Sequence, residues 1–146
     1  MRDELNFYIN GEWVESDSSE TIEVVNPANE EIIGHVTAGS KQDINSAVMA
    51  ANEAFKLFSQ TSKNERIAYL EAIIKEYENR YQDFVDTITL EMGAPTWLSN
   101  KAQASTGIKN FNETLDALKI YEFEKPEGDY LLRKEPIGVI GMITPW

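Results

Sequence analysis

Residues 136–143, PIGVIGMI, constrain the fold more than any other stretch, because they are apolar without the alternation of a half-exposed strand. Strands covered on both faces, as in a parallel sheet between helices, have this composition. A parallel strand reaches its neighbour only through a crossover of about a dozen residues or more. The stretch therefore predicts an α/β fold whose sheet is incomplete in this chain, with residues 136–146 as its first parallel strand.

The beginning of the chain has turn signals between strand-like runs. Asn10-Gly11, in FYINGEWV, is typical of a type I′ hairpin because both residues tolerate positive φ. A second turn is expected at NPAN, residues 26–29, since Pro27 cannot donate a hydrogen bond to a ladder. Residues 1–37 are therefore expected to be rich in β-structure.

The middle of the chain has helical periodicity. Apolar residues at steps of three and four predict helices over about 41–59 and 63–81. A shorter helix is expected to end near Gly93, with Pro95 as a stop. A third long apolar stripe covers residues 97–118.

Local signals support the starts of two of these helices. Ser40 with Asp43 forms a weak capping box, and Ser62 with Glu65 forms a complete one. Gly107 lies inside the third stripe, where glycine costs ~1 kcal/mol relative to alanine. A close contact between helices would explain this glycine.

The pattern returns to strand after residue 118. KIYEFE and YLLRKE flank the turn-rich KPEGD, so residues 119–135 are predicted to form a projecting hairpin that is polar on one face. The expected organisation is a first part over 1–118, this hairpin over 119–135, and the apolar strand over 136–146.

Composition narrows the class of protein. The 13 basic and 25 acidic side chains give a net charge of −12, which disfavours nucleic acid and anionic membrane surfaces as partners. The chain has no cysteine, which excludes disulfides, thiolate metal sites and a cysteine nucleophile within it. The N-terminus lacks an apolar signal core, and no apolar run is long enough to span a bilayer. We therefore expect a soluble, cytoplasmic protein.

The end of the apolar strand is where chemistry is expected. Ligands of open α/β sheets bind beyond the carboxyl ends of the strands. Thr144, Pro145 and Trp146 lie at such an end and combine a hydroxyl, a stiff backbone and a flat ring. These residues suit a shelf for a cofactor, and the alternative is a core strand followed by a turn.

The last twelve residues, EPIGVIGMITPW, resemble the strand of NAD(P)-dependent aldehyde dehydrogenases that runs P-x-G-V-x-G-x-I-x-P-W and continues into Asn. YINGEWV, VVNPANEEIIGHV and LEMGAP appear upstream in the order of that family. The resemblance covers essentially all 146 residues and identifies them as the N-terminal portion of a family chain. It implies β-hairpins, helices, a protruding hairpin and the first strand of a Rossmann-like cofactor domain.

The resemblance implies a function for the full-length protein. Family members oxidise an aldehyde to a carboxylic acid with NAD or NADP, through a cysteine thiohemiacetal. Ile143, Thr144, Pro145 and Trp146 are then expected to border the nicotinamide. The nucleophile and the base lie further on in the family, so the 146-residue chain alone is expected to be inactive. The alternative is a truncated, non-catalytic binding or assembly module of the same family.

Two further roles come from the resemblance. Some members hold a monovalent cation at positions equivalent to Val24, Val25 and Glu91, although here the acid is Glu rather than the more usual Asp. A solvated Glu91 at a helix end is the alternative. The 119–135 hairpin resembles the segment that joins subunits, which implies a homo-oligomer. The aldehyde itself is left open, and so is the choice between NAD and NADP.

Overall fold

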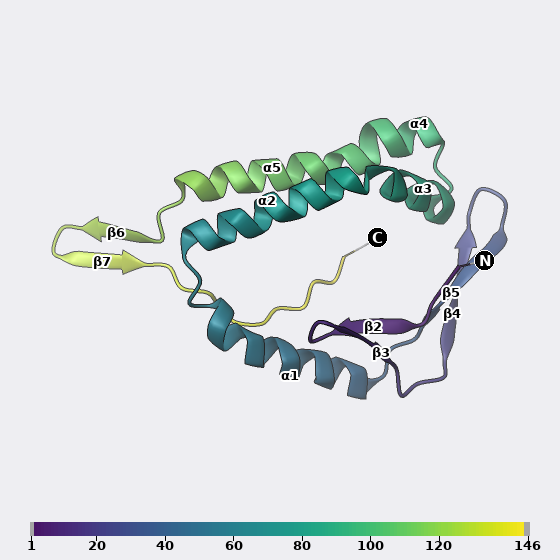
Figure 1. Cartoon of the computed structure of the whole chain (residues 1–146), viewed down its shortest axis with the longest axis horizontal. Coiled ribbons are helices and arrows are strands. Elements are labelled where there is room, and N and C mark those ends of the chain that lie inside the picture. Colours follow the sequence, from purple (N-terminus) through teal and green to yellow (C-terminus); the bar gives the residue numbers. More distant parts are fainter. Residues whose placement is uncertain (1, 145–146) are drawn as a thin grey trace.

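The computed structural model describes residues 2–144, except for the side chain of residue 2. Strands come first along the chain, helices follow, and a hairpin precedes the C-terminal segment. Figure 1 shows helices α2, α3 and α5 on one side of the molecule, with helix α1 and the N-terminal strands on the other.

The N-terminal region is β-rich, as predicted. Strands β2 (Asn6–Ile9) and β3 (Glu12–Glu15) form an antiparallel hairpin. Its turn residues Asn10 and Gly11 have φ of 55° and 84°, which confirms the predicted type I′ turn. Strands β4 (Thr21–Asn26) and β5 (Glu31–Thr37) pair across the predicted NPAN turn.

An additional strand, β1 (Arg2–Glu4), pairs in parallel with β5 and gives the strand order β1-β5-β4. It was missed because its charged sequence has no apolar alternation. The Asp3 carboxylate accepts the backbone N–H of His35 at 3.0 Å and also lies 3.0 Å from the His35 Nδ1 atom. The only histidine of the sequence therefore holds an edge strand in place.

Helices α1 (Lys41–Phe58) and α2 (Lys63–Asn79) begin where the capping boxes predict. In each box the serine hydroxyl accepts a backbone N–H, and the acidic side chain accepts the backbone N–H of the serine. Helix α3 (Tyr81–Met92) follows α2 almost directly and ends at Gly93, whose φ of 63° is left-handed.

The third apolar stripe forms a helix whose hydrogen-bond register changes along its length. A short α4 (Thr96–Leu98) leads into a π-helical segment, η1 (Ser99–Ala104), and then into α5 (Ser105–Ile120). The Tyr77 hydroxyl donates to the Ala104 carbonyl at 2.9 Å, and that of Tyr81 donates to the Asn100 carbonyl. Two tyrosines from α2 and α3 therefore bind carbonyls of the π-helical segment.

The core of the described residues lies in this helical layer, which packs α2 and α3 against η1 and α5. Its buried side chains are Ile74, Val85, Ser99, Ala104 and Leu115. The buried Ser99 hydroxyl accepts a hydrogen bond from Thr89 at 2.9 Å. A Cβ on Gly107 would lie 2.4 Å from the Tyr77 hydroxyl oxygen, which confirms that this glycine permits a close helix contact.

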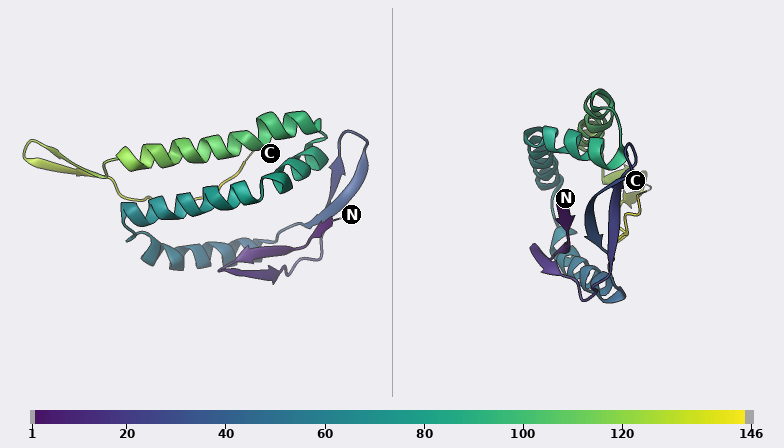
Figure 2. Two further views of the ribbon diagram at one scale, coloured as in Figure 1. Left: turned by 45° about the horizontal axis from the view of Figure 1, so that its top comes forward. Right: turned by 90° about the vertical axis from the view of Figure 1, so that its right-hand side faces the viewer.

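Strands β6 (Glu124–Glu127) and β7 (Tyr130–Arg133) form the predicted hairpin. Gly128 has a φ of 62° at the first central position of its turn, as a type II′ turn requires. All eight strand residues are exposed. Figures 1 and 2 show the hairpin projecting from one end of the molecule.

The predicted strand over 136–146 is not formed in its described part. Residues 134–144 belong to neither helix nor strand, and they return from the hairpin along the molecule (Figure 1). The physical reason is that no strand among residues 2–144 offers a parallel ladder to this segment. The α/β element order is confirmed, with the apolar segment unpaired. Within the described part of the chain, no helix combines the length and apolarity needed to cross a bilayer.

Candidate functional site

The C-terminal segment of residues 136–144 presents its apolar side chains to solvent. Ile137 is 93% exposed and Ile143 is 96% exposed. Gly138 has a φ of 120°, a conformation that side-chain-bearing residues rarely adopt. An apolar run of this kind, open to solvent, provides surface that another part of a protein or a ligand can cover.

The predicted cofactor-facing residues lie at the end of this segment. Ile143 offers an apolar side chain and Thr144 a hydroxyl, and both are exposed in the described structure. Pro145 and Trp146 lie outside the described residues. An aliphatic side chain beside a hydroxyl suits one wall of a site for a flat, partly polar ring, so the described residues fit a nicotinamide.

The predicted cation residues lie around one groove. Val24 of β4 and Glu91 of α3 both line a groove of about 880 Å³ between the sheet and α3. The groove also has an apolar floor that includes Trp13 and Phe84. The structure therefore brings Val24 and Glu91 to the same space, as the cation hypothesis requires.

Val25 follows Val24 in β4, and successive side chains of a strand point to opposite faces of the sheet. Val24 pairs with Gly34 whereas Val25 pairs with Ile32, so a bulge leaves Ile33 without an opposite residue. Val25 is not among the residues that line the groove. Over residues 2–144, acidic and histidine side chains form no group of three or more that could hold a metal ion. The cation hypothesis keeps two of its three residues together.

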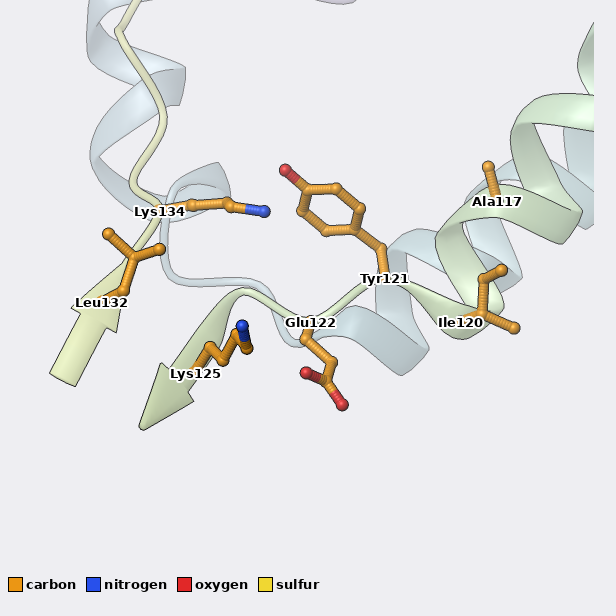
Figure 3. Close-up of a pocket in the computed structure, with 7 residues that line it drawn as sticks. All are labelled: Ala117, Ile120, Tyr121, Glu122, Lys125, Leu132 and Lys134. Carbon is orange, nitrogen blue, oxygen red and sulfur yellow. The ribbon is translucent and has the colours of Figure 1, made fainter. Parts of the chain in front are cut away.

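A second candidate surface lies at the root of the β6–β7 hairpin. Figure 3 shows a pocket of about 380 Å³ between the end of α5 and the hairpin. Ile120 and Leu132 form apolar walls, and the Lys134 side chain points toward the Tyr121 ring. Because Ile120 and the hairpin strands are exposed, this end of the molecule offers an apolar contact surface.

Basic residues around the hairpin root were missed by the sequence analysis. Lys63 and Arg66 come from the first turn of α2, and Lys134 follows β7. Their neighbours are the aromatic residues Tyr121 and Phe123. In the sequence, the only signal for this cluster is the pair of aromatic residues close to a basic one. That signal does not show that Lys63 and Arg66 of α2 contact the pair.

The sequence profile of the aldehyde dehydrogenase family matches residues 13–146. A protein of Staphylococcus aureus strain RF122, named "Putative aldehyde dehydrogenase", is 55% identical over all 146 residues. The match covers 100% of this chain and 31% of that protein, so the chain spans about a third of the length of this relative.

Solved structures give the same result for the fold. An aldehyde dehydrogenase from Bartonella henselae aligns with a TM-score of 0.85 and 34% identity over 88% of this chain and 28% of its own. A variant of aldehyde dehydrogenase C from Pseudomonas syringae, complexed with NAD⁺ and octanal, aligns with a TM-score of 0.81 and 36% identity over 84% of this chain and 25% of its own. A Mycobacterium tuberculosis aldehyde dehydrogenase complexed with NAD⁺ aligns with a TM-score of 0.84 and 26% identity, over 92% of this chain and 29% of its own. The family match, the relative and these structures agree that the chain belongs to the aldehyde dehydrogenase family and has the fold of its N-terminal part.

Proposed function

We propose that this chain provides the N-terminal portion of an NAD(P)-dependent aldehyde dehydrogenase that oxidises an aldehyde to a carboxylic acid. The observation that carries the proposal is the 55% identity to the Staphylococcus aureus relative, which extends over the whole chain. The structural likeness to a dehydrogenase complexed with NAD⁺ and octanal supports it. An aldehyde is therefore the proposed substrate class.

In this proposal the C-terminal residues border the cofactor. Ile143, Thr144, Pro145 and Trp146 would lie against the nicotinamide of NAD or NADP, which accepts a hydride when bound. Ile143 would exclude water from one face of the ring, and the Thr144 hydroxyl would orient its polar edge. Support comes from the exposure of both side chains and from the family match, which runs to residue 146.

The chain is not expected to catalyse this oxidation by itself. Oxidation through a thiohemiacetal needs a thiol nucleophile, and the sequence contains no cysteine. The nucleophile must then come from the two thirds of the family protein that this chain does not match. A non-catalytic assembly module is the second candidate, because the exposed hairpin is suited to association without chemistry.

We also propose that residues 119–135 join two copies into a homo-oligomer. A two-stranded hairpin leaves both of its edges free, and a free edge can pair with another chain. Tyr130 is 81% exposed at the hairpin and Ile120 is 83% exposed at its root. Burial of such side chains in a partner contributes roughly 1.5–3 kcal/mol each.

The proposal also includes a cation site, the classes of partner and the cellular location. A monovalent cation would lie in the groove that Val24 and Glu91 line, with Val25 as the third proposed residue. The net charge of −12 argues against nucleic acid and anionic membrane surfaces as partners. A cytoplasmic location is proposed from the family match.

A chimera tests the proposal directly. Residues 1–146 of this chain replace the matched residues of the Staphylococcus aureus relative, and NAD⁺ reduction is measured with octanal as the aldehyde probe. We expect turnover by the chimera and none by the 146-residue chain. Replacing the nucleophilic cysteine of the recipient by alanine is the matched control and abolishes turnover.

The outcome of the assay separates the two candidates. A folded chimera that binds NAD⁺ but reduces none with any of a panel of aliphatic and aromatic aldehydes would favour the assembly module. Native mass spectrometry of the same chimera measures assembly, and a monomer would contradict the proposed role of the hairpin.

A further inference from the structure

We propose that Lys63, Arg66 and Lys134 form a cationic clamp around Tyr121 and Phe123 that fixes the direction of the β6–β7 hairpin. These three basic residues form the hairpin clamp. The proposal deepens the assembly role of residues 119–135 and rests on it for its consequence. By fixing the hairpin direction, the clamp would set how one subunit presents its association surface to another.

The hairpin needs such a device because its strands have no packing of their own. All residues of β6 and β7 are exposed, and a lone two-stranded hairpin is marginally stable in water. The backbone N–H of Lys134 donates to the Phe123 carbonyl at 2.8 Å, which closes the root of the hairpin. The direction of the hairpin must therefore be set by contacts of the root with the helical layer.

Lys63 provides the first of these contacts. It is the first residue of α2, and its Nζ atom donates to the Lys119 carbonyl at 3.0 Å and to the Tyr121 carbonyl at 3.4 Å. The last carbonyls of a helix lack partners within the helix, and a basic side chain can satisfy them. One ammonium group thus connects the start of α2 to the point where the chain leaves α5.

Arg66 provides the second contact, one helical turn further along α2. Its guanidinium carbon lies 5.3 Å from the centre of the Phe123 ring. The Nε atom donates to the Thr61 hydroxyl at 3.0 Å, and Nη2 donates to the Ser59 carbonyl at 3.4 Å. The guanidinium plane is therefore held by the α1–α2 connection, which gives Phe123 a fixed surface to pack on.

Lys134, the residue directly after β7, completes the clamp. Its Nζ atom lies 4.3 Å from the centre of the Tyr121 ring, a contact that the reader can follow in Figure 3. The Tyr121 and Phe123 rings meet edge to face with their centres 4.9 Å apart. Each ring of the aromatic pair is thus contacted by one cation, and a cation–π contact contributes ~0.5–1 kcal/mol at an exposed site.

The groups that these three cations contact indicate whether they hold the hairpin or bind an external anion. A phosphate or carboxylate site needs donors that are free to turn toward the ligand. Here Lys63 and Arg66 donate to carbonyls and a hydroxyl of the chain, and Lys134 lies over a ring. The charges are directed at the hairpin root, so they are better suited to positioning it than to binding a ligand.

The absence of cysteine makes the direction of the hairpin measurable. Asp129→Cys in the hairpin turn and Glu71→Cys on α2 give two spin-label positions in the 146-residue chain, both exposed. Pulsed electron paramagnetic resonance then gives the distribution of distances between them. We expect one narrow peak in the chain with an intact clamp.

Clamp variants are compared in that labelled background. For Arg66→Met, the ratio of hairpins outside the main peak to those within it rises about two- to fivefold, as the loss of an exposed cation–π contact implies. Arg66→Lys recovers only part of the loss, because an ammonium lacks the planar fork. Lys75→Met, on an exposed position of the same helix, is the matched control and leaves the peak unchanged. Circular dichroism verifies that each variant keeps its helices.

The outcomes separate the clamp from the assembly role. A broad distribution in the parent chain, or a peak that Arg66→Met does not broaden, overturns the clamp. Native mass spectrometry of the chimera carrying Lys63→Met and Arg66→Met then tests the consequence. If the parent chimera is monomeric, only the assembly role is refuted. If the variant with the broadened distance distribution keeps the oligomeric state of the parent chimera, the link between hairpin direction and assembly is refuted.

Discussion

The helical layer of α2, α3 and α5 and the C-terminal segment of residues 136–144 are both rich in apolar side chains, but only the helical layer buries them. Ile74, Val85 and Leu115 are buried between helices that this chain itself provides. The side chains of Ile137 and Ile143 are open to solvent. Apolar content is therefore sufficient for burial only where the chain also provides the opposite surface.

The two regions also differ in where their conformation is determined. Within the helical layer, α2 begins at a capping box, where Ser62 and Glu65 three positions later satisfy each other's backbone N–H groups. A parallel strand has no such local determinant, because its hydrogen bonds go to another strand. The comparison can be tested by substitutions that act on one region and leave the other unchanged.

The largest effect is expected for Leu115→Ala in α5. Leu115 is only 6% exposed, and removal of a buried leucine side chain typically lowers the free energy of unfolding by about 2–5 kcal/mol. Leu57→Ala on α1 is the control, since Leu57 is 81% exposed and its loss should cost less than about 0.5 kcal/mol. Urea unfolding monitored by circular dichroism measures both. Equal losses for the two variants would contradict the placement of the core.

A smaller loss is expected for Gly93→Ala, where α3 meets the β4–β5 turn. The residue has a φ of 63°, and an added Cβ would lie 2.7 Å from the Ala28 backbone nitrogen. Backbone strain and overpacking together are expected to cost about 1–3 kcal/mol of unfolding free energy.

Gly128→Ala is the matched control for Gly93→Ala. Its φ of 62° is nearly the same, but an added Cβ would meet nothing within 4 Å. Because the hairpin is separate from the helical core, the main unfolding transition should shift less than it does for Gly93→Ala. A larger shift for Gly128→Ala would mean that the hairpin unfolds together with the core.

The third prediction tests the local determinant at the start of α2. Ser62→Ala removes the hydroxyl that caps the helix and should lower the unfolding free energy by ~1 kcal/mol at neutral pH. Hydrogen bonds from the Ser62 hydroxyl and backbone N–H lower the pKa of Glu65 below its ordinary value of 4.5. Ionised Glu65 therefore stabilises the fold above that value, and this contribution is lost as the pH falls through the lower folded-state pKa.

The difference in unfolding free energy between wild type and Ser62→Ala should consequently become smaller as the pH falls below the ordinary pKa of Glu65. Urea midpoints measured across a pH series give this difference. Glu71→Gln, on an exposed position of the same helix, serves as the control for general charge effects. A difference that stays constant with pH would show that the carboxylate and the hydroxyl act independently.

These comparisons explain how much the sequence could predict. Turns at Asn10-Gly11 and caps at Ser40 and Ser62 depend on residues a few positions apart, so a single sequence contains the whole determinant. The π-helical segment Ser99–Ala104 was not predicted, because its register depends on hydroxyls of Tyr77 and Tyr81 from other helices. Strand β1 was missed because its charged sequence has no apolar alternation, and only its pairing with β5 defines it.

The candidate site likewise has features that the sequence predicted and features that it did not. The motif around Ile143 and Thr144 identified the family, and the family match confirms that identification. Val24 and Glu91 line one groove and Val25 is not among its lining residues, and the cation hypothesis stays a prediction. The hairpin clamp joins residues more than fifty positions apart, which a single sequence cannot pair.

The smallest effect is expected for Ile137→Ser in the C-terminal segment. Ile137 is almost fully exposed and is not among the proposed cofactor-facing residues, so the free energy of unfolding of the 146-residue chain should change by less than about 0.5 kcal/mol. Binding of a hydrophobic dye by the chain should decrease, because the substitution removes apolar surface.

The same substitution in the Staphylococcus aureus chimera makes the comparison sharper. If the two thirds of the family protein that this chain does not match cover this segment, Ile137 becomes a buried side chain, and its loss should then cost at least roughly 1.5–3 kcal/mol. Leu115→Ala should cost the same in both proteins, because its contacts come from this chain alone. Should Ile137→Ser stay neutral in a folded, active chimera, the segment would be a surface in the whole enzyme as well. The difference between the two regions would then reflect the fold itself rather than missing neighbours.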